Sequence, residues 1–187
     1  IRWLPGDTDA PPPTMVLLHG ILGSRRNLLS FAKRLVESHP DWQILLPDLR
    51  CHGESSARPE TLEGPNTVES AARDVLALLQ QLKIYPSMLA GHSFGGKVVL
   101  EMVLLSPTPT LPKPVQVWVL DTVPGDTWIS GGDHPRDTIN FCRTLQPPFP
   151  TRAYLVDLLT GAGFTRAGAQ WMTTNLRPVR GVKSRSA

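Results

Sequence analysis

The chain has 187 residues, of which 41% are hydrophobic and 19% charged, a composition that excludes a disordered chain and suits one folded domain. The formal net charge of +3 is small and gathers in the C-terminal tail, so no nucleic-acid surface is expected. No apolar run approaches the ~20 residues needed to cross a bilayer. The two cysteines, Cys51 and Cys142, have no metal-type spacing and are expected to be reduced thiols. The compartment stays open, because a targeting peptide could precede Ile1 and an organelle is compatible with the sequence.

Short apolar runs alternate with amphipathic segments over the first two thirds of the chain. The pattern predicts buried strands at residues 14–18, 43–46, 87–90 and 115–120. It predicts helices at residues 27–38, 66–83 and 94–105. Strand–helix alternation of these lengths favours parallel pairing with right-handed crossovers, hence a doubly wound α/β sheet. Ligands of such sheets bind at the carboxyl ends of the strands.

Two local features of the predicted helices are specific enough to check. Asn66 is placed to cap the second helix, with Glu69 completing a capping box. In the third helix, Lys97 and Glu101 are four residues apart, a spacing that allows them to pair.

The segment from Ser87 to Lys97 carries the strongest chemical signal. It contains Gly91-His92-Ser93-Phe94-Gly95, a Gly-x-Ser-x-Gly motif between a predicted strand and a predicted helix. In that context the motif is typical of a nucleophile elbow, a tight turn that exposes the serine hydroxyl. Bulk at Gly91 or Gly95 would block such a turn.

A phosphate-binding loop is the alternative interpretation of the same segment. Gly91 to Lys97 fits Gly-x4-Gly-Lys, and Asp121 after an apolar run could hold magnesium. Position 98 is valine, however, whereas such a loop needs a Ser or Thr hydroxyl for the metal. A nucleotide-binding protein is therefore the weaker hypothesis.

The character of the sequence changes beyond Thr122. Short amphipathic helices are predicted at residues 137–145, 151–159 and 166–176. They and the preceding loop carry aromatic residues that are candidates to line an acyl-binding pocket, among them Trp128, Phe141, Tyr154 and Trp171. The alternative is that these aromatic side chains form the core of a small helical subdomain.

Three motifs in order carry a resemblance to a known family. They are His19-Gly20 after a strand, the run Asp48-Leu49-Arg50-Cys51-His52-Gly53-Glu54-Ser55, and Gly91-His92-Ser93-Phe94-Gly95-Gly96. Together they resemble the α/β-hydrolase fold superfamily. The stretch Ala169 to Leu176 resembles the end of the helical cap in a subgroup of small esterases and acyl-thioester hydrolases.

The resemblance implies a role for each matching position. Ser93 would be the nucleophile, and Asp121, at the end of the fourth strand, the catalytic acid. The oxyanion hole would use the backbone N–H groups of Ile21 and Phe94. Hydrogen-bond donors there are chemically sensible, because acyl transfer builds negative charge on the carbonyl oxygen. Neither a metal nor an organic cofactor is implied.

The general base has no match. In the family it is a histidine after the last strand. None of the five histidines of this chain occupies that position. His19 and His52 are assigned structural roles in core motifs, and His92 is expected to be buried and to face away from Ser93. His39 lies at a helix end, and His134 is placed in the cap.

The resemblance also implies that the last strands of the family are missing, so the chain is C-terminally truncated or carries a variant ending. The expected domains are an α/β-hydrolase core at residues 1–122, a helical cap at 123–177 and a basic tail at 178–187. Missing strands would leave an apolar sheet edge uncovered, which favours self-association.

These observations predict a serine hydrolase of carboxylic esters or thioesters that works through an acyl-serine intermediate and is impaired by the missing histidine. The partner is a small acyl ester or thioester. The alternative hypothesis is a non-catalytic, hydrolase-like binding protein.

Overall fold

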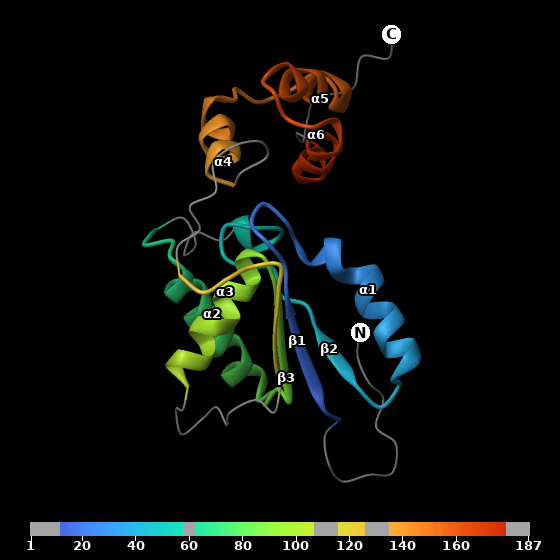
Figure 1. Cartoon of the computed structure of the whole chain (residues 1–187), viewed down its shortest axis with the longest axis vertical. Helices are drawn as coiled ribbons and strands as arrows, with labels where there is room; N and C mark the ends of the chain where they lie inside the picture. The colour runs from blue at the N-terminus through green and yellow to red at the C-terminus, as the bar shows by residue number, and fades with distance from the viewer. Residues whose placement is uncertain (1–11, 58–62, 107–115, 126–134, 179–187) are drawn as a thin grey trace. The chain divides into compact units, whose positions relative to one another are not determined.

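The computed structural model describes residues 12–57, 63–106, 116–125 and 135–178 (Figure 1). The chain divides into two compact units, residues 1–126 and 127–187. Each unit is considered by itself. The predicted tail lies outside the described residues from 179 onward.

The first unit is built on a parallel sheet. Its strands are β1 (Thr14–Leu18), β2 (Gln43–Leu45), β3 (Met88–His92) and β4 (Gln116–Leu120). The order in the sheet is β2-β1-β3-β4, and all three neighbouring pairs run parallel. This order confirms the doubly wound α/β prediction, since the chain first moves outward from β1 to β2 and then returns to the other side of β1.

Helices cover both faces of this sheet. They are α1 (Arg25–Ser38), α2 (Val68–Leu82) and α3 (Phe94–Leu105), with a 3₁₀ turn, η1, at Ser55–Ala57. Helix α1 lies on one face, and α2 and α3 lie together on the other (Figure 1). The predicted helices are confirmed, with ends shifted by one or two residues.

Alternate residues of β1 pack into two separate apolar cores, one on each face of the sheet. Val16 and Leu18 pack with residues of α2 and α3, whereas Met15 and Leu17 pack on the side of α1. All four side chains are buried. A strand with both faces covered has no polar side, which explains why β1 reads as one continuous apolar run.

The capping of α2 differs from the prediction by one residue. Thr67, not Asn66, is the N-cap, and its hydroxyl accepts a hydrogen bond from the Ser70 N–H at 3.1 Å. Thr67 is extended, as an N-cap requires. Sequence alone could not decide between adjacent Asn and Thr residues, because both are good N-caps.

Strand β4 pairs with β3 only, within the part of the chain that the structure describes. Its residues are mostly exposed, and Trp118 keeps 46% of its surface accessible. The strand carries no charged residue. The first unit therefore presents an uncharged, apolar edge, as expected from the sequence.

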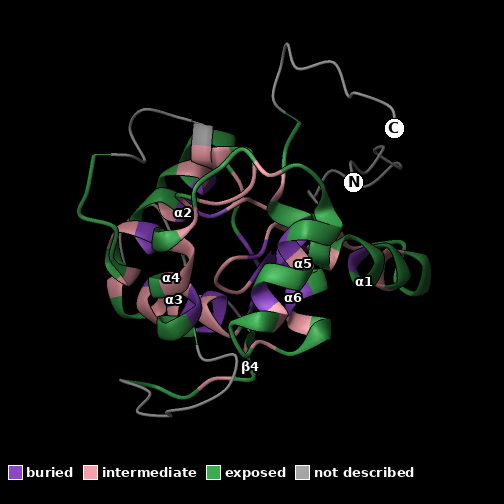
Figure 2. Cartoon of the chain, turned by 90° about the horizontal axis from the view of Figure 1, so that it is seen from above, coloured by how far each residue is buried: buried purple, intermediate pink, exposed green. Residues whose placement is uncertain are grey.

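The second unit is a small helical assembly. It contains α4 (Pro135–Thr144), α5 (Arg152–Gly161), α6 (Arg166–Met172) and a 3₁₀ turn, η3, at Thr173–Asn175. Figure 2 shows buried positions on α5 and α6, which pack together around Leu155, Leu159 and Ala169. All three predicted helices are present, and the third ends early by tightening into η3. Among the described residues, no helix is long and apolar enough to cross a membrane.

Candidate active site

Ser93 lies in a strained turn between the central strand β3 and helix α3. Its backbone has φ 52° and ψ −117°, a conformation that L-residues rarely adopt. Its N–H donates to the Leu120 carbonyl at 2.8 Å, and α3 begins at the next residue, Phe94. Within the described chain its hydroxyl has no hydrogen-bond partner. The turn thus holds a serine oxygen at the carboxyl end of the sheet.

Glycines make this turn sterically feasible. A Cβ on Gly91 would lie 2.2 Å from the Gly95 carbonyl oxygen, and one on Gly95 would lie 2.6 Å from the carbonyl oxygens of Leu18 and His19. Both distances are far below van der Waals contact, so no side chain fits at either position. The requirement for glycine at Gly91 and Gly95 is confirmed.

The loop after β1 lies directly against the serine. A Cβ on Gly20 would be 3.3 Å from the Cβ of Ser93. Ile21 follows Gly20, and its N–H, like that of Phe94, has no acceptor among the described residues. Phe94 is the first residue of α3, where N–H groups have no intrahelical partner and the helix dipole favours negative charge.

The turn does not have the form of a phosphate-binding loop. Residues Phe94 to Lys97 already belong to α3, so no open loop is present to cradle phosphates. The Lys97 ammonium donates to the backbone carbonyls of Val123, at 3.1 Å, and Gly125. The geometry therefore argues against the nucleotide hypothesis.

Asp121 lies at the end of β4, with φ 55° and a side chain that is 86% exposed. Its Oδ2 is 3.7 Å from Nε2 of His92. The prediction that His92 is buried was wrong, because 49% of its side chain is exposed. His92 is the last residue of β3 and pairs with Leu120, the last residue of β4. Asp121 follows Leu120, which explains why its carboxylate lies near the His92 ring.

His19 and His52 use both ring nitrogens in hydrogen bonds to the backbone: Nε2 of each ring bonds across to the other loop, and Nδ1 bonds within its own loop. The Leu49 N–H donates to Nε2 of His19 at 3.0 Å, so its Nδ1–H donates to the Gly20 carbonyl at 2.8 Å. The Leu22 N–H donates to Nε2 of His52 at 2.9 Å, while Nδ1–H bonds the Arg50 carbonyl. Through Nε2, both rings link the loop after β1 to the loop after β2, as predicted for structural histidines.

Burial changes the ionisation of His19. Desolvation lowers its pKa to about 4, although the hydrogen bond to the Gly20 carbonyl opposes the shift. The imidazole is therefore neutral at neutral pH, the state in which Nε2 can accept from Leu49. A ring with both nitrogens engaged cannot also take a proton from Ser93.

Asp48 organises the loop after β2. Its carboxylate, 3% exposed, accepts from the backbone N–H groups of Arg25 at 2.7 Å and Glu54 at 2.9 Å, and forms an ion pair with Arg25. Burial alone would raise its pKa, but these donors hold the pKa below its usual value. Gly53, at φ 52°, is required because a Cβ there would overlap this carboxylate.

Two histidines of the chain remain, His39 and His134. His39 is the C-cap of α1, beyond the last turn of that helix. His134 lies outside the described residues. Over the described ranges, no group of three or more His, Cys, Asp or Glu side chains could hold a metal ion.

The aromatic candidates in the second unit differ in their surroundings. Trp128 lies outside the described residues. Phe141 packs in the core of this unit, with its ring centroid 5.2 Å from that of Phe164. Tyr154 and Trp171 are 50% and 39% exposed. Phe141 therefore serves the structural core, and Tyr154 and Trp171 are the aromatic side chains accessible to a ligand.

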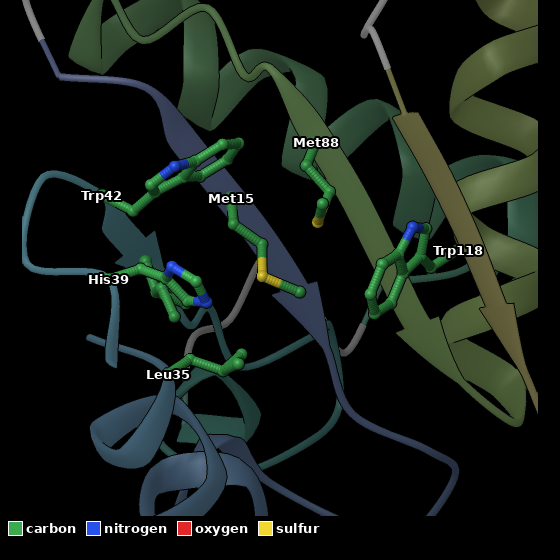
Figure 3. A pocket seen from close by; sticks show the side chains of 7 residues that line it. Met15, Leu35, His39, Trp42, Met88 and Trp118 are labelled. Atoms are coloured by element: carbon green, nitrogen blue, oxygen red, sulfur yellow. The ribbon is translucent and has the colours of Figure 1, made fainter. Parts of the chain in front are cut away.

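A separate apolar groove of about 260 Å³ opens on the α1 face of the sheet. Figure 3 shows Trp42, Leu35, His39 and Met15 on one side of it and Met88 and Trp118 on the other. Met15 and Met88 lie near the amino ends of their strands. The groove therefore opens away from the strand ends that carry Ser93 and Asp121.

The sequence comparison agrees with this architecture. Residues 13–138 match the alpha/beta hydrolase fold family. A parallel sheet ordered β2-β1-β3-β4, with a Gly-x-Ser-x-Gly turn at the end of a central strand, is consistent with that match. The chain belongs to the alpha/beta hydrolase fold family.

Relatives within this family include proteins named as lipases and esterases. The chain is 38% identical over 101 residues to the sn-1-specific diacylglycerol lipase ABHD11 of Mus musculus, a match covering 54% of this chain and 31% of that protein. It is 35% identical over 92 residues to esterase YbfF of Escherichia coli (strain K12), covering 49% and 33%. The matched segments thus span about a third of the length of these relatives.

A solved structure shares the fold over most of the chain. A marine microorganism esterase superposes with a TM-score of 0.71 at 21% identity, covering 90% of this chain and 61% of that one. Proteins named as esterases and lipases are therefore among the relatives of this chain.

Proposed function

We propose that this chain is a serine hydrolase of carboxylic esters or thioesters, with Ser93 as the nucleophile. The observation that carries the proposal is the strained turn at the N-terminus of α3, which holds a Ser93 hydroxyl that has no hydrogen-bond partner among the described residues. In the proposed reaction, Ser93 Oγ loses its proton to a base and attacks the acyl carbonyl. The leaving alcohol or thiol takes that proton from the base. Water, losing a proton to the base, then attacks the acyl-serine, and the acid is released as the Ser93 oxygen regains its proton.

The backbone N–H groups of Ile21 and Phe94 are the proposed oxyanion hole. Support comes from the close approach of Gly20 to Ser93 and from the free N–H at the start of α3. Losing one such donor raises the barrier by about 2.7–4 kcal/mol in comparable enzymes. Asp121 is the proposed acid, since it follows the strand next to β3.

We further propose that turnover by this chain is impaired. The ring nitrogens of His19 and His52 are committed to backbone groups, and His39 caps α1. His92 lies beside Asp121, but it directly precedes Ser93 in the chain, and no hydrogen bond joins the two side chains. Without an oriented imidazole the hydroxyl is a weak nucleophile.

The second unit is proposed as a cap that supplies acyl-binding surface. In this proposal the core is residues 1–122, the cap 123–177 and the tail 178–187. Tyr154 and Trp171 are the proposed contacts, because they are exposed aromatic side chains of this unit. Trp128, which lies outside the described residues, stays a candidate from the sequence alone. A mouse relative carries the name diacylglycerol lipase, so a diacylglycerol belongs among the substrates to test.

A fluorophosphonate probe combined with a p-nitrophenyl acetate assay tests this function. We expect slow covalent labelling of the chain at Ser93, no labelling of Ser93→Ala, and ester turnover well below that of a full-length esterase. The matched control is Ser30→Ala, which removes an exposed hydroxyl from α1. Labelling that persists in Ser93→Ala would exclude Ser93 as the nucleophile.

A non-catalytic binding protein is the second candidate, favoured by the lack of an available histidine beside Ser93 among the described residues. It predicts no covalent labelling of Ser93 at any probe concentration. Binding of a diacylglycerol or a short ester without turnover, measured by isothermal calorimetry, would support this candidate.

A further inference from the structure

Lys97 makes contacts that its position in α3 does not explain. It lies in the first turn of the helix, where the helix dipole disfavours a positive charge. Its sequence-predicted partner, Glu101, forms no ion pair with it in the described structure. The ammonium instead donates to the carbonyls of Val123 and Gly125.

These two carbonyls belong to the segment that leaves β4. Residues 121–125 start with Asp121 in a left-handed conformation and end at Gly125, which also has a positive φ of 78°. The backbone therefore turns within this segment, and the carbonyls of Val123 and Gly125 both accept hydrogen bonds from the Lys97 ammonium.

A second, independent contact lies beside the ammonium. A Cβ on Gly96 would come within 2.7 Å of Thr122 Cγ2, so the backbone of α3 touches the same segment directly. Together with the hydrogen bond from the Ser93 N–H to the Leu120 carbonyl, α3 and its preceding turn hold residues 120, 122, 123 and 125.

We propose that Lys97 is a positioning residue: it fixes residues 121–125 against the first turn of α3 and thereby keeps Asp121 beside the Ser93 turn. The part about Asp121 rests on the proposed function. The clamp itself does not, since it is a contact between the helix and the loop.

Hydrogen exchange tests the clamp without reference to catalysis. Lys97→Met removes the donor, and we expect amide exchange in a peptide covering residues 116–125, which includes the β4 strand that the segment leaves, to rise about tenfold. Lys97→Arg, which keeps charge and donors, should return exchange to within about threefold of the parent chain. The control is Glu101→Gln, one turn further along α3. Unchanged exchange in Lys97→Met would overturn the proposal, and if that variant fails to fold, Lys97→Gln is compared with Lys97→Arg.

Labelling of Ser93 by the fluorophosphonate probe tests the positioning role. We expect Lys97→Met to label about tenfold more slowly, Lys97→Arg to recover, and Lys97→Met combined with Asp121→Asn to be no slower than the slower single variant. Faster exchange with unchanged labelling would overturn the positioning role. If the parent chain is not labelled at all, the proposed function fails, whereas the exchange result still decides whether the clamp exists.

Discussion

The N–H of Ser93 donates a hydrogen bond to the carbonyl of Leu120 at 2.8 Å, the residue just before Asp121. The backbone of the proposed nucleophile and that of the proposed acid are therefore joined by the last rung of the β3–β4 pairing. Because this rung uses the Ser93 N–H, the N–H that remains for an oxyanion on this side is that of Phe94. Backbone pairing between β3 and β4 thus holds Ser93 close to Asp121 without help from their side chains.

Replacing Ser93 by glycine is expected to stabilise the protein while abolishing labelling. The residue is held at φ 52° and ψ −117°, which glycine adopts without steric cost. Ser93→Gly should be about 1 kcal/mol more stable than Ser93→Ala, which keeps the strain. Urea unfolding of both variants measures this difference, and a less stable glycine variant would contradict the strain.

Adding one methyl group at Gly95 is expected to prevent normal folding. The new Cβ would lie 2.6 Å from two backbone oxygens at the end of β1, and backbone cannot move aside cheaply. Gly95→Ala should lower the free energy of unfolding by about 3 kcal/mol or more. Gly161→Ala is the matched control, because a Cβ there meets nothing within 4 Å. Equal stability of the two variants in thermal unfolding would refute the close approach.

Stability is expected to fall as the pH drops from about 6.5 toward 4. Burial lowers the pKa of His19 to about 4 in the folded chain, whereas the unfolded chain keeps the ordinary value near 6.5. Between these pH values His19 is protonated in the unfolded chain but not in the folded chain. Lowering the pH through this range therefore reduces the free energy of unfolding by on the order of 3 kcal/mol. Above 6.5 His19 is neutral in both states and contributes no slope.

Urea midpoints measured at about pH 7.5 and about pH 4.5 check this expectation. His19→Gln keeps an acceptor for the Leu49 N–H and should flatten the dependence, whereas His39→Asn, at the α1 C-cap, should not reduce it as much. Asp48 acts at lower pH, since its depressed pKa makes stability fall only below its ordinary value near 4. A His19→Gln variant with the parent's slope would contradict the assignment.

The β4 edge is expected to mediate self-association of this chain. Trp118 is 46% exposed on a strand without charges, and such an edge can pair with the same strand of a second copy. We expect a concentration-dependent dimer in analytical ultracentrifugation, and Trp118→Lys should abolish it. The control is Tyr85→Lys, at an exposed tyrosine before β3. A monomer at every concentration would rule out this edge as an interface.

Local patterns predicted the elements well, because each strand and helix depends on the periodicity of its own residues. β1 was predicted with its observed ends, α3 likewise, and the need for Gly91 and Gly95 followed from the turn they flank. The errors lie where neighbouring residues compete or where partners come from elsewhere in the chain. The N-cap of α2 is Thr67 and not Asn66, and the Lys97 ammonium donates to backbone carbonyls and not to Glu101.

The sequence by itself determined the parallel α/β architecture, the position of Ser93 at a strand–helix turn and the uncharged character of residues 116–120. The first follows from the alternation of strands and helices along the chain, and the other two are properties of short contiguous segments. Only the tertiary structure decided that His92 is exposed beside Asp121 and that Lys97 holds residues 123 and 125. Those relationships join β3, α3 and the end of β4. They depend on where the sheet register brings distant segments together, which no local pattern contains.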